Sequence, residues 1–168
     1  MKLMIASDLH GSAYYCEKLI NALPKDAKLG LYECPYPYKR VISPELLKWI
    51  ASTGKFAFLK DTCCSLDQLK AKCEAVKGTA LKIYNANGAT LLESMRMGVA
   101  GYSGVMANFH PDLYAWLCEH FADEDKQEMV QEMMDYLPNA TDRILYMNGN
   151  PVPWWLRTKG ENKSMATY

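Results

Sequence analysis

Short apolar runs alternate with helix-length segments through the middle of this chain, and this alternation restricts its fold more than any other feature. The apolar runs are residues 29–33, 56–59, 81–84 and 99–105. The segments that follow them and read as helices are residues 43–51, 65–78, 90–97 and 111–121. Strands that alternate with helices of this length pair in parallel, because each helix crosses back over the sheet. The pattern therefore predicts four βα units in an α/β fold.

The ends of the chain depart from this alternation. Residues 2–6 form a short apolar run, and residues 13–23 read as a helix that ends at Pro24. Residues 123–137 predict a polar, Met-rich helix, whereas the tail contains turn formers and Trp154-Trp155. We therefore expect three parts. They are an N-terminal fragment at 1–23, a βα region at 24–137 and an irregular or β-rich tail at 138–168.

Charge and cysteine usage exclude several classes of function. The chain has 19 lysines and arginines against 19 acidic residues, so no excess of charge points to nucleic acid or to an anionic membrane. No stretch is apolar for long enough to cross a bilayer, and the start turns acidic too soon for a secretion signal. The six cysteines form no CxxC pair, which favours reduced thiols in a cytoplasmic protein.

Lys60 is the first candidate for a functional residue. It closes the apolar run 56–59 and is followed directly by Asp61. In a barrel, the carboxyl end of a parallel strand faces the catalytic side. Desolvation there would favour a neutral amine that can attack a ketone. On position alone, a solvated lysine at a strand end is the alternative.

Four segments occur in order at barrel spacing and strengthen the catalytic interpretation. They are Leu-Gly-Leu-Tyr-Glu-Cys-Pro from residue 29, Phe-Leu-Lys-Asp-Thr from residue 58, Leu-Lys-Ile-Tyr-Asn from residue 81, and Gly-Tyr-Ser-Gly-Val-Met-Ala-Asn from residue 101. This series resembles the dihydrodipicolinate synthase and N-acetylneuraminate lyase family across residues 29–121. The resemblance implies an α/β fold with strands five to eight of a (β/α)8 TIM barrel, to which a foreign N-terminal strand and helix and a Trp-rich tail are attached.

The same resemblance implies a class I pyruvate-dependent aldolase, a carbon–carbon lyase that works through a Schiff base. Lys60 matches the family's imine-forming lysine, and Tyr32 with Pro35 matches its proton-relaying Tyr-x-x-Pro loop. Backbone groups near Asn85 and Ser103 would line the pyruvate pocket. The imine is covalent, so no cofactor is expected; the implied partner is a small 2-oxo acid, and a homo-oligomer is compatible with the family.

Two family features have no counterpart in this sequence. Pro37 stands where the synthases often carry an arginine for a substrate carboxylate, with Lys39 and Arg40 only nearby. The Gly-Thr-Thr-Gly segment that holds the pyruvate carboxylate is also missing, along with strands one to four. Without this carboxylate clamp we expect an imine at Lys60 to be poorly oriented.

The first twenty residues resemble a second family. Met-Lys-Leu-Met-Ile-Ala-Ser-Asp-Leu-His-Gly-Ser looks like the start of a calcineurin-like metallophosphoesterase of the bacterial phosphodiesterase branch. That resemblance implies Asp8 and His10 as ligands of Mn²⁺ or a similar ion. The later ligand segments of that family have no counterpart, and two ligands do not close a metal site.

Three functions therefore remain open from the sequence. The first is the pyruvate-dependent lyase. The second is an inactive or self-associating half-barrel from a mosaic gene, because open sheet edges and an exposed apolar face favour association. A metal-dependent phosphodiesterase ranks last.

Overall fold

A parallel sheet of four strands forms the centre of the molecule, in the order β1-β2-β3-β4. The protein is described here by a computed structural model that covers residues 12–24, 26–35, 39–108, 110–147 and 150–151. The strands are β1 (Leu29–Tyr32), β2 (Phe56–Asp61), β3 (Lys82–Asn85) and β4 (Gly101–Tyr102), with a separate antiparallel pair, β5 (Tyr146–Met147) and β6 (Asn150–Pro151). Each neighbouring pair in the four-stranded sheet is parallel, as the βα alternation predicts.

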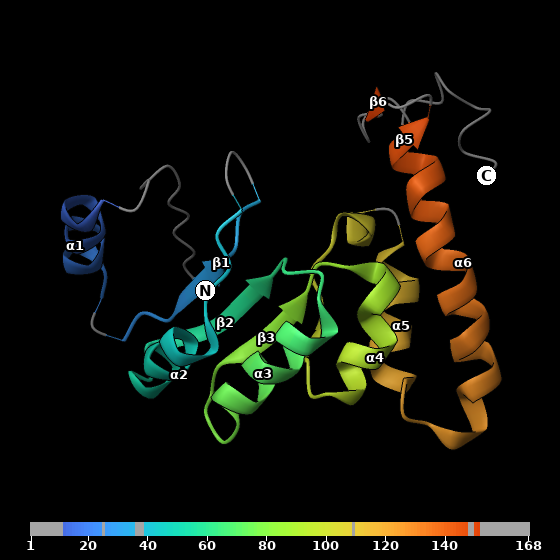
Figure 1. Cartoon of the computed structure of the whole chain (residues 1–168), viewed down its shortest axis with the longest axis horizontal. Helices are drawn as coiled ribbons and strands as arrows, with labels where there is room; N and C mark the ends of the chain where they lie inside the picture. The colour runs from blue at the N-terminus through green and yellow to red at the C-terminus, as the bar shows by residue number, and fades with distance from the viewer. Residues whose placement is uncertain (1–11, 25, 36–38, 109, 148–149, 152–168) are drawn as a thin grey trace.

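Helices connect the strands and cover one face of this sheet. The α-helices are α1 (Ala13–Ala22), α2 (Pro44–Ser52), α3 (Leu66–Val76), α4 (Leu91–Arg96), α5 (Pro111–His120) and α6 (Gln127–Leu145). Short 3₁₀ segments are η1 (Gly88–Thr90), η2 (Val105–Asn108) and η3 (Glu124–Lys126). Figure 1 shows α1 beyond the β1 edge of the sheet and α6 at the opposite end of the molecule.

Serine caps fix where α2 and α3 begin, within the ranges that the sequence predicts to be helical. The Ser43 side chain accepts a hydrogen bond from the Leu46 amide, and Pro44 occupies the first turn of α2. The Ser65 side chain accepts in the same way from the Gln68 amide. Each cap satisfies a backbone donor that the first turn of a helix leaves without a partner.

The core lies between the sheet and the helices. Side chains alternate along a strand, so one face of β2 and β3 carries Leu59 and Ile83, which are buried against the helices. Leu47 and Leu69 meet them from α2 and α3, and both are fully buried. The other face carries Phe58, which is 44% exposed. The sheet thus has a covered face and an uncovered face.

Two predicted elements differ from those in the structure. The run 99–105 contains a strand of only two residues. Just after it, the Tyr102 ring packs over Gly104, where a Cβ atom would lie 2.0 Å from the tyrosine hydroxyl. The helix predicted to end at residue 137 extends to Leu145, so the expected boundary after residue 137 falls inside α6. The apolar run 2–6 and Trp154-Trp155 lie outside the described residues.

Among the residues that the structure describes, no helix combines the length and apolar character that a membrane span requires.

Adjacent leucines in α2 provide a test of the packing. Leu47 is fully buried, whereas Leu46 is 49% exposed. We expect Leu47→Ala to lower the free energy of unfolding by about 2–5 kcal/mol, because it leaves a cavity between α2 and the sheet. The matched variant Leu46→Ala should change it by less than about 1 kcal/mol. Urea denaturation followed by circular dichroism measures both, and equal losses would contradict this packing.

Candidate functional site

Tyr32 and Lys60 lie side by side at the carboxyl ends of β1 and β2. The two residues are register partners in the parallel pair, so their side chains project from the same face. The Lys60 ammonium nitrogen lies 4.8 Å from the centre of the Tyr32 ring, within cation–π range. The structure thus brings together the two residues that the sequence assigned to catalysis.

This pair lies on the uncovered face of the sheet. Tyr32 is 53% exposed and Lys60 is partly buried. Tyr84 is the register partner of Lys60 on β3, and its ring meets that of Phe58 edge to face. Aromatic rings therefore flank the amine, while solvent reaches it from the open side.

Burial raises the pKa of the Tyr32 hydroxyl, and the neighbouring Cys34 thiol raises it further. A phenol with a raised pKa keeps its proton at neutral pH. A tyrosine of ordinary pKa is also protonated at neutral pH, so this shift does not change the protonation state of Tyr32 there.

Asn85 and Ser103, the residues expected to line the pocket, lie at the carboxyl ends of β3 and β4. Asn85 is fully buried, and its side-chain amide donates to Thr90 Oγ1 and Ser94 Oγ, both at 3.0 Å. It pairs with Asp61, so its side chain lies on the covered face, opposite Lys60. The Ser103 amide donates to the Asn85 carbonyl at 2.8 Å. The Asn85 side chain is thus held in the core, and its backbone carbonyl is bonded to Ser103.

A cluster of three charged residues lies buried behind the Lys60–Tyr32 pair. Glu33 follows Tyr32, Asp61 follows Lys60, and Lys72 reaches both carboxylates from α3. Their exposed fractions are 2%, 0% and 1%. The Lys72 ammonium donates to Glu33 Oε1 at 2.6 Å and also to Asp61 Oδ2. One positive and two negative charges leave the cluster with one net negative charge.

The Glu33 carboxylate also receives two backbone amides. Oε1 accepts from Ile42 at 2.8 Å, and Oε2 accepts from Thr62 at 3.1 Å. The Glu33 backbone amide donates to the Lys60 carbonyl at 3.2 Å, and the Thr62 hydroxyl donates to the Glu33 carbonyl at 2.6 Å. Glu33 therefore joins β1, the end of β2 and the segment that leads into α2.

The hydrogen bonds of this cluster favour the charged forms of Asp61 and Lys72. Burial opposes the charge on Asp61, but hydrogen bonds from Lys72 and from the Cys63 amide outweigh it and lower the pKa of the carboxyl. Burial also opposes the charge on Lys72, yet its bonds to Asp61 and Glu33 raise the pKa of the ammonium. A buried charge is tolerated only when it is paired in this way.

The sequence reasoning did not single out Glu33 and Lys72. The position of Lys72 in the sequence does indicate burial. It lies three residues after Leu69 and four before Val76, which is the spacing of residues on the buried face of a helix. A lysine on such a face requires a buried acid. The acids are 39 and 11 residues away in the sequence, so only the fold identifies them.

Burial and the nearby Asp61 raise the pKa of the Cys63 thiol to about 11. The thiol is therefore protonated at neutral pH, and a protonated thiol is a poor nucleophile.

The proposed metal ligands Asp8 and His10 lie outside the described residues. Within the described part of the chain, no group of three or more histidine, cysteine, aspartate or glutamate residues could hold a metal ion.

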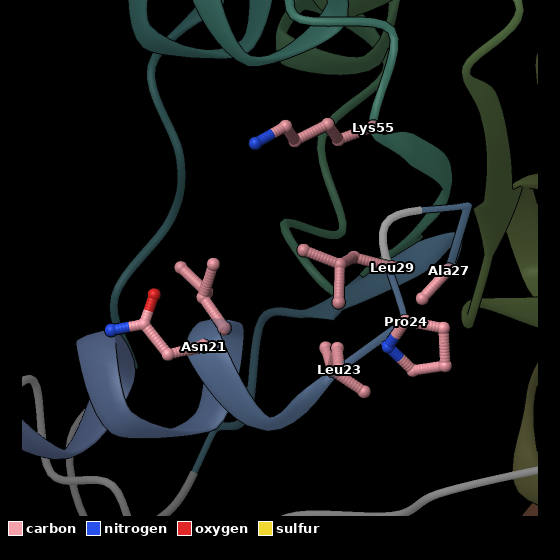
Figure 2. Close-up of a pocket in the computed structure, with 7 residues that line it drawn as sticks. Asn21, Leu23, Pro24, Ala27, Leu29 and Lys55 are labelled. Carbon is pink, nitrogen blue, oxygen red and sulfur yellow. The ribbon is translucent and has the colours of Figure 1, made fainter.

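A cavity of about 410 Å³ lies at the other end of the sheet. It is lined by residues from α1, from the segment before β1 and by Lys55 before β2. Figure 2 shows the Lys55 side chain on one side of the cavity and Asn21, Leu23 and Pro24 on the other. Leu29, which begins β1, lies on its wall. This cavity is thus at the amino end of the strands and is separate from the Lys60 site.

Comparison with known proteins connects this geometry to one family. The sequence pattern of the dihydrodipicolinate synthetase family matches residues 11–165. The chain belongs to the dihydrodipicolinate synthetase family. This match spans both boundaries that the sequence suggested, after residues 23 and 137, and begins after Asp8 and His10. The likeness of the first twenty residues to a metallophosphoesterase stays a prediction.

Individual family members agree with this assignment. The chain is 27% identical over 123 residues to the 4-hydroxy-tetrahydrodipicolinate synthase of Clostridium perfringens strain SM101, an alignment that covers 73% of this chain and 41% of that enzyme. It resembles the chloride-inhibited, pyruvate-bound dihydrodipicolinate synthase of Acinetobacter baumannii, with a TM-score of 0.68 and 23% identity over 92% of this chain and 52% of that one. The lysine-bound enzyme of Cyanidioschyzon merolae gives a TM-score of 0.71 and 22% identity, again over 92% of this chain and 52% of that enzyme.

These relatives are longer than this chain. The chain spans less than half of the synthase from Clostridium and about half of the two solved enzymes. The structural likeness shows a shared α/β fold with a parallel sheet.

The buried cluster predicts how stability depends on pH. The pKa of Asp61 is lower in the folded chain than the value of about 3.9 in an unfolded one. The Asp61 carboxylate therefore contributes fully to the stability of the fold when the pH is above the pKa of the unfolded chain. This contribution is lost as the pH falls through the pKa of Asp61 in the folded chain. We expect Asp61→Asn to lower the free energy of unfolding by about 1–3 kcal/mol at pH 7. The difference from the wild type should narrow below about pH 4.

Urea denaturation at a series of pH values measures this difference. Asp67→Asn, at an exposed position in the first turn of α3, is the matched control and should show a much smaller effect. A difference for Asp61→Asn that stays constant from pH 7 to pH 3 would contradict the charged state assigned to this carboxyl.

Proposed function

We propose that this chain is a class I pyruvate-dependent lyase of its family, with Lys60 as the imine-forming residue and Tyr32 as the proton relay. The observation that carries the proposal is the register pairing of these two residues on the uncovered face, with the amine 4.8 Å from the ring centre. Family membership supports the same chemistry. In this proposal β1 to β4 correspond to strands five to eight of a (β/α)8 barrel.

The reaction begins at the ketone of a small 2-oxo acid. The neutral amine of Lys60 attacks the carbonyl carbon, and the resulting carbinolamine loses water to give an imine. The protonated imine nitrogen accepts electron density, so a proton leaves the adjacent methyl group and an enamine forms. The enamine carbon then bonds to an aldehyde, and water hydrolyses the product from Lys60. Carbon–carbon cleavage is the reverse sequence.

Tyr32 has a separate task in this scheme. Its hydroxyl protonates the hydroxyl group of the carbinolamine, which departs as water, and the phenolate that remains takes up the proton released from the methyl group. The phenol then protonates the oxygen of the aldehyde as the carbon–carbon bond forms, and it recovers that proton when water adds to the final imine.

Trapping with borohydride tests the nucleophile. Incubation with pyruvate and sodium borohydride should add one reduced pyruvate to the peptide that contains Lys60, detected by mass spectrometry. The adduct should disappear in Lys60→Met. It should persist in Lys82→Met, which removes an exposed lysine at the start of β3. An adduct spread over many lysines, or none on folded wild-type protein, would refute the assignment.

The variant Tyr32→Phe tests the proposed proton transfer by Tyr32 separately from the nucleophilic attack by Lys60. It keeps the ring beside Lys60 but removes the proton, so the rate of adduct formation should fall by roughly 10²–10⁴-fold. The adduct should still form at Lys60 over a long incubation. An unchanged rate would remove Tyr32 from the mechanism while leaving Lys60 in place.

A self-associating half-barrel is the second candidate, and the uncovered sheet face favours it. Tyr32 and Phe58 are 53% and 44% exposed on that face. Association of two copies would bury this aromatic surface. Size-exclusion chromatography with light scattering should then give twice the chain mass of 19.0 kDa. Phe58→Lys, which places a charge on the face, should reduce the mass to that of one chain; a well-folded monomeric wild type would contradict the candidate.

A further inference from the structure

The arrangement of charge around Lys60 differs between the two faces of the sheet. On the open face, its register partners are the aromatic residues Tyr32 from β1 and Tyr84 from β3, and the exposed Lys82 lies two residues before Tyr84. Beyond the carboxyl end of β2, the Lys39 ammonium donates to the Cys63 carbonyl at 3.3 Å. Behind Lys60, on the covered face, lie Asp61 from β2 and Glu33 from β1, and Lys72 from α3 contacts both. Lys60 therefore sits directly in front of a buried cluster with one net negative charge.

The same cluster fixes the strand ends that carry the proposed catalytic pair. Glu33 is bonded to Tyr32 through the chain and accepts hydrogen bonds from Ile42 and Thr62. Asp61 is bonded to Lys60 and accepts from the Cys63 amide at 2.9 Å. Lys72 links the two carboxylates. A shift of either carboxylate would displace Tyr32 relative to Lys60.

Packing alone does not require a charged residue at this position. Buried ion clusters are often no more stable than apolar side chains of equal volume, because desolvation offsets the attraction between the charges. Removal of one partner is costly, since it leaves an uncompensated buried charge. An apolar side chain at position 72 could fill the same volume, but it could not bond two carboxylates at once. Nor could it reduce the charge behind Lys60 to one net negative charge.

We propose that Lys72 is a positioning residue for the Lys60–Tyr32 pair. Acting through Glu33 and Asp61, it holds the ends of β1 and β2 together and limits the charge behind the amine to one net negative. This inference rests on the proposed function, in which Lys60 and Tyr32 are the catalytic residues. Lys72 itself is buried on the other side of the sheet and does not touch the substrate.

The proposal predicts opposite effects for two variants. Lys72→Met leaves Glu33 and Asp61 without their cation. At the alkaline pH where an amine titrates, both carboxylates are ionised; their two charges favour the ammonium form of Lys60 and move the pH of half-maximal amine reactivity up by roughly one unit. Glu33→Gln leaves the cluster neutral and should move the same midpoint down by roughly one unit. In the double variant Lys72→Met/Glu33→Gln, Asp61 again leaves one net negative charge, so the midpoint should return to the wild-type value.

Competitive labelling with acetic anhydride measures this midpoint without any substrate. Mass spectrometry follows acetylation of Lys60 against pH, with the exposed Lys82 as the internal reference. Circular dichroism confirms that each variant is folded under the labelling conditions. Lys70→Met removes an exposed lysine from the same helix and should leave the midpoint unchanged. If Lys72→Met fails to fold, the downward shift in Glu33→Gln and the restored midpoint of the double variant still decide the question.

Trapping with pyruvate and borohydride gives the second measurement. At a fixed pH below the midpoint, folded Lys72→Met should form the Lys60 adduct about tenfold more slowly than the wild type, in line with a shift of one pH unit. The double variant should recover most of this rate.

The outcomes separate the two proposals. If the Lys60 labelling midpoint moves as predicted but wild-type protein forms no pyruvate adduct, the proposed function fails and the positioning role stands. If the adduct forms but all variants share one midpoint and one trapping rate, Lys72 only stabilises the fold and the positioning role is overturned. Shifts of the same sign in Lys72→Met and Glu33→Gln would also overturn it.

Discussion

The parallel pairing of β1 with β2 is the constraint on which the rest of this structure depends. It places Tyr32 opposite Lys60 on one face and, one residue later, Glu33 and Asp61 on the other. Because side chains alternate along a strand, a slip of one residue in either strand would exchange these faces. The candidate nucleophile would then lie among the helices, and buried carboxylates would lie in solvent.

The charges on the covered face make such a slip costly. Glu33 and Asp61 have their hydrogen bonds satisfied only when Lys72, Ile42, Thr62 and Cys63 occupy their present places. A slip would carry the carboxylates to the open face and leave the Lys72 ammonium buried without its partners, which is among the most destabilising changes a protein core can undergo. Polar contacts of this kind specify a unique arrangement, whereas apolar contacts such as those of Leu59 tolerate several. The cluster thus protects the register on which the open face depends.

Much of the fold could be predicted from the sequence because local signals agreed with the tertiary arrangement. Ser43 and Ser65 cap the helices that the sequence predicts at 43–51 and 65–78, and the apolar runs form parallel strands in chain order. Of the candidate site, the order of the motifs identifies Tyr32 and Lys60 but not Lys72. A helical lysine is normally solvated, and its burial depends on acids from two strands. The sequence does not predict the short length of β4 either, and the packing of the Tyr102 ring over Gly104 just after it is a contact that apolar patterning does not encode.

The two ends of the sheet carry different kinds of side chain. The carboxyl ends carry Lys60, Tyr32, the buried cluster and the amide network of Asn85, whereas the amino ends border a cavity lined mainly by apolar side chains and Lys55. In barrels, groups at the carboxyl ends of strands serve catalysis and those at the amino ends serve stability. A parallel sheet produces this division by itself, because all its strands end on the same side. For this chain, the consequence is that every group proposed to act on a 2-oxo acid comes from a strand terminus. The helices support these termini from behind, α3 through Lys72 and α4 through Ser94, which bonds Asn85.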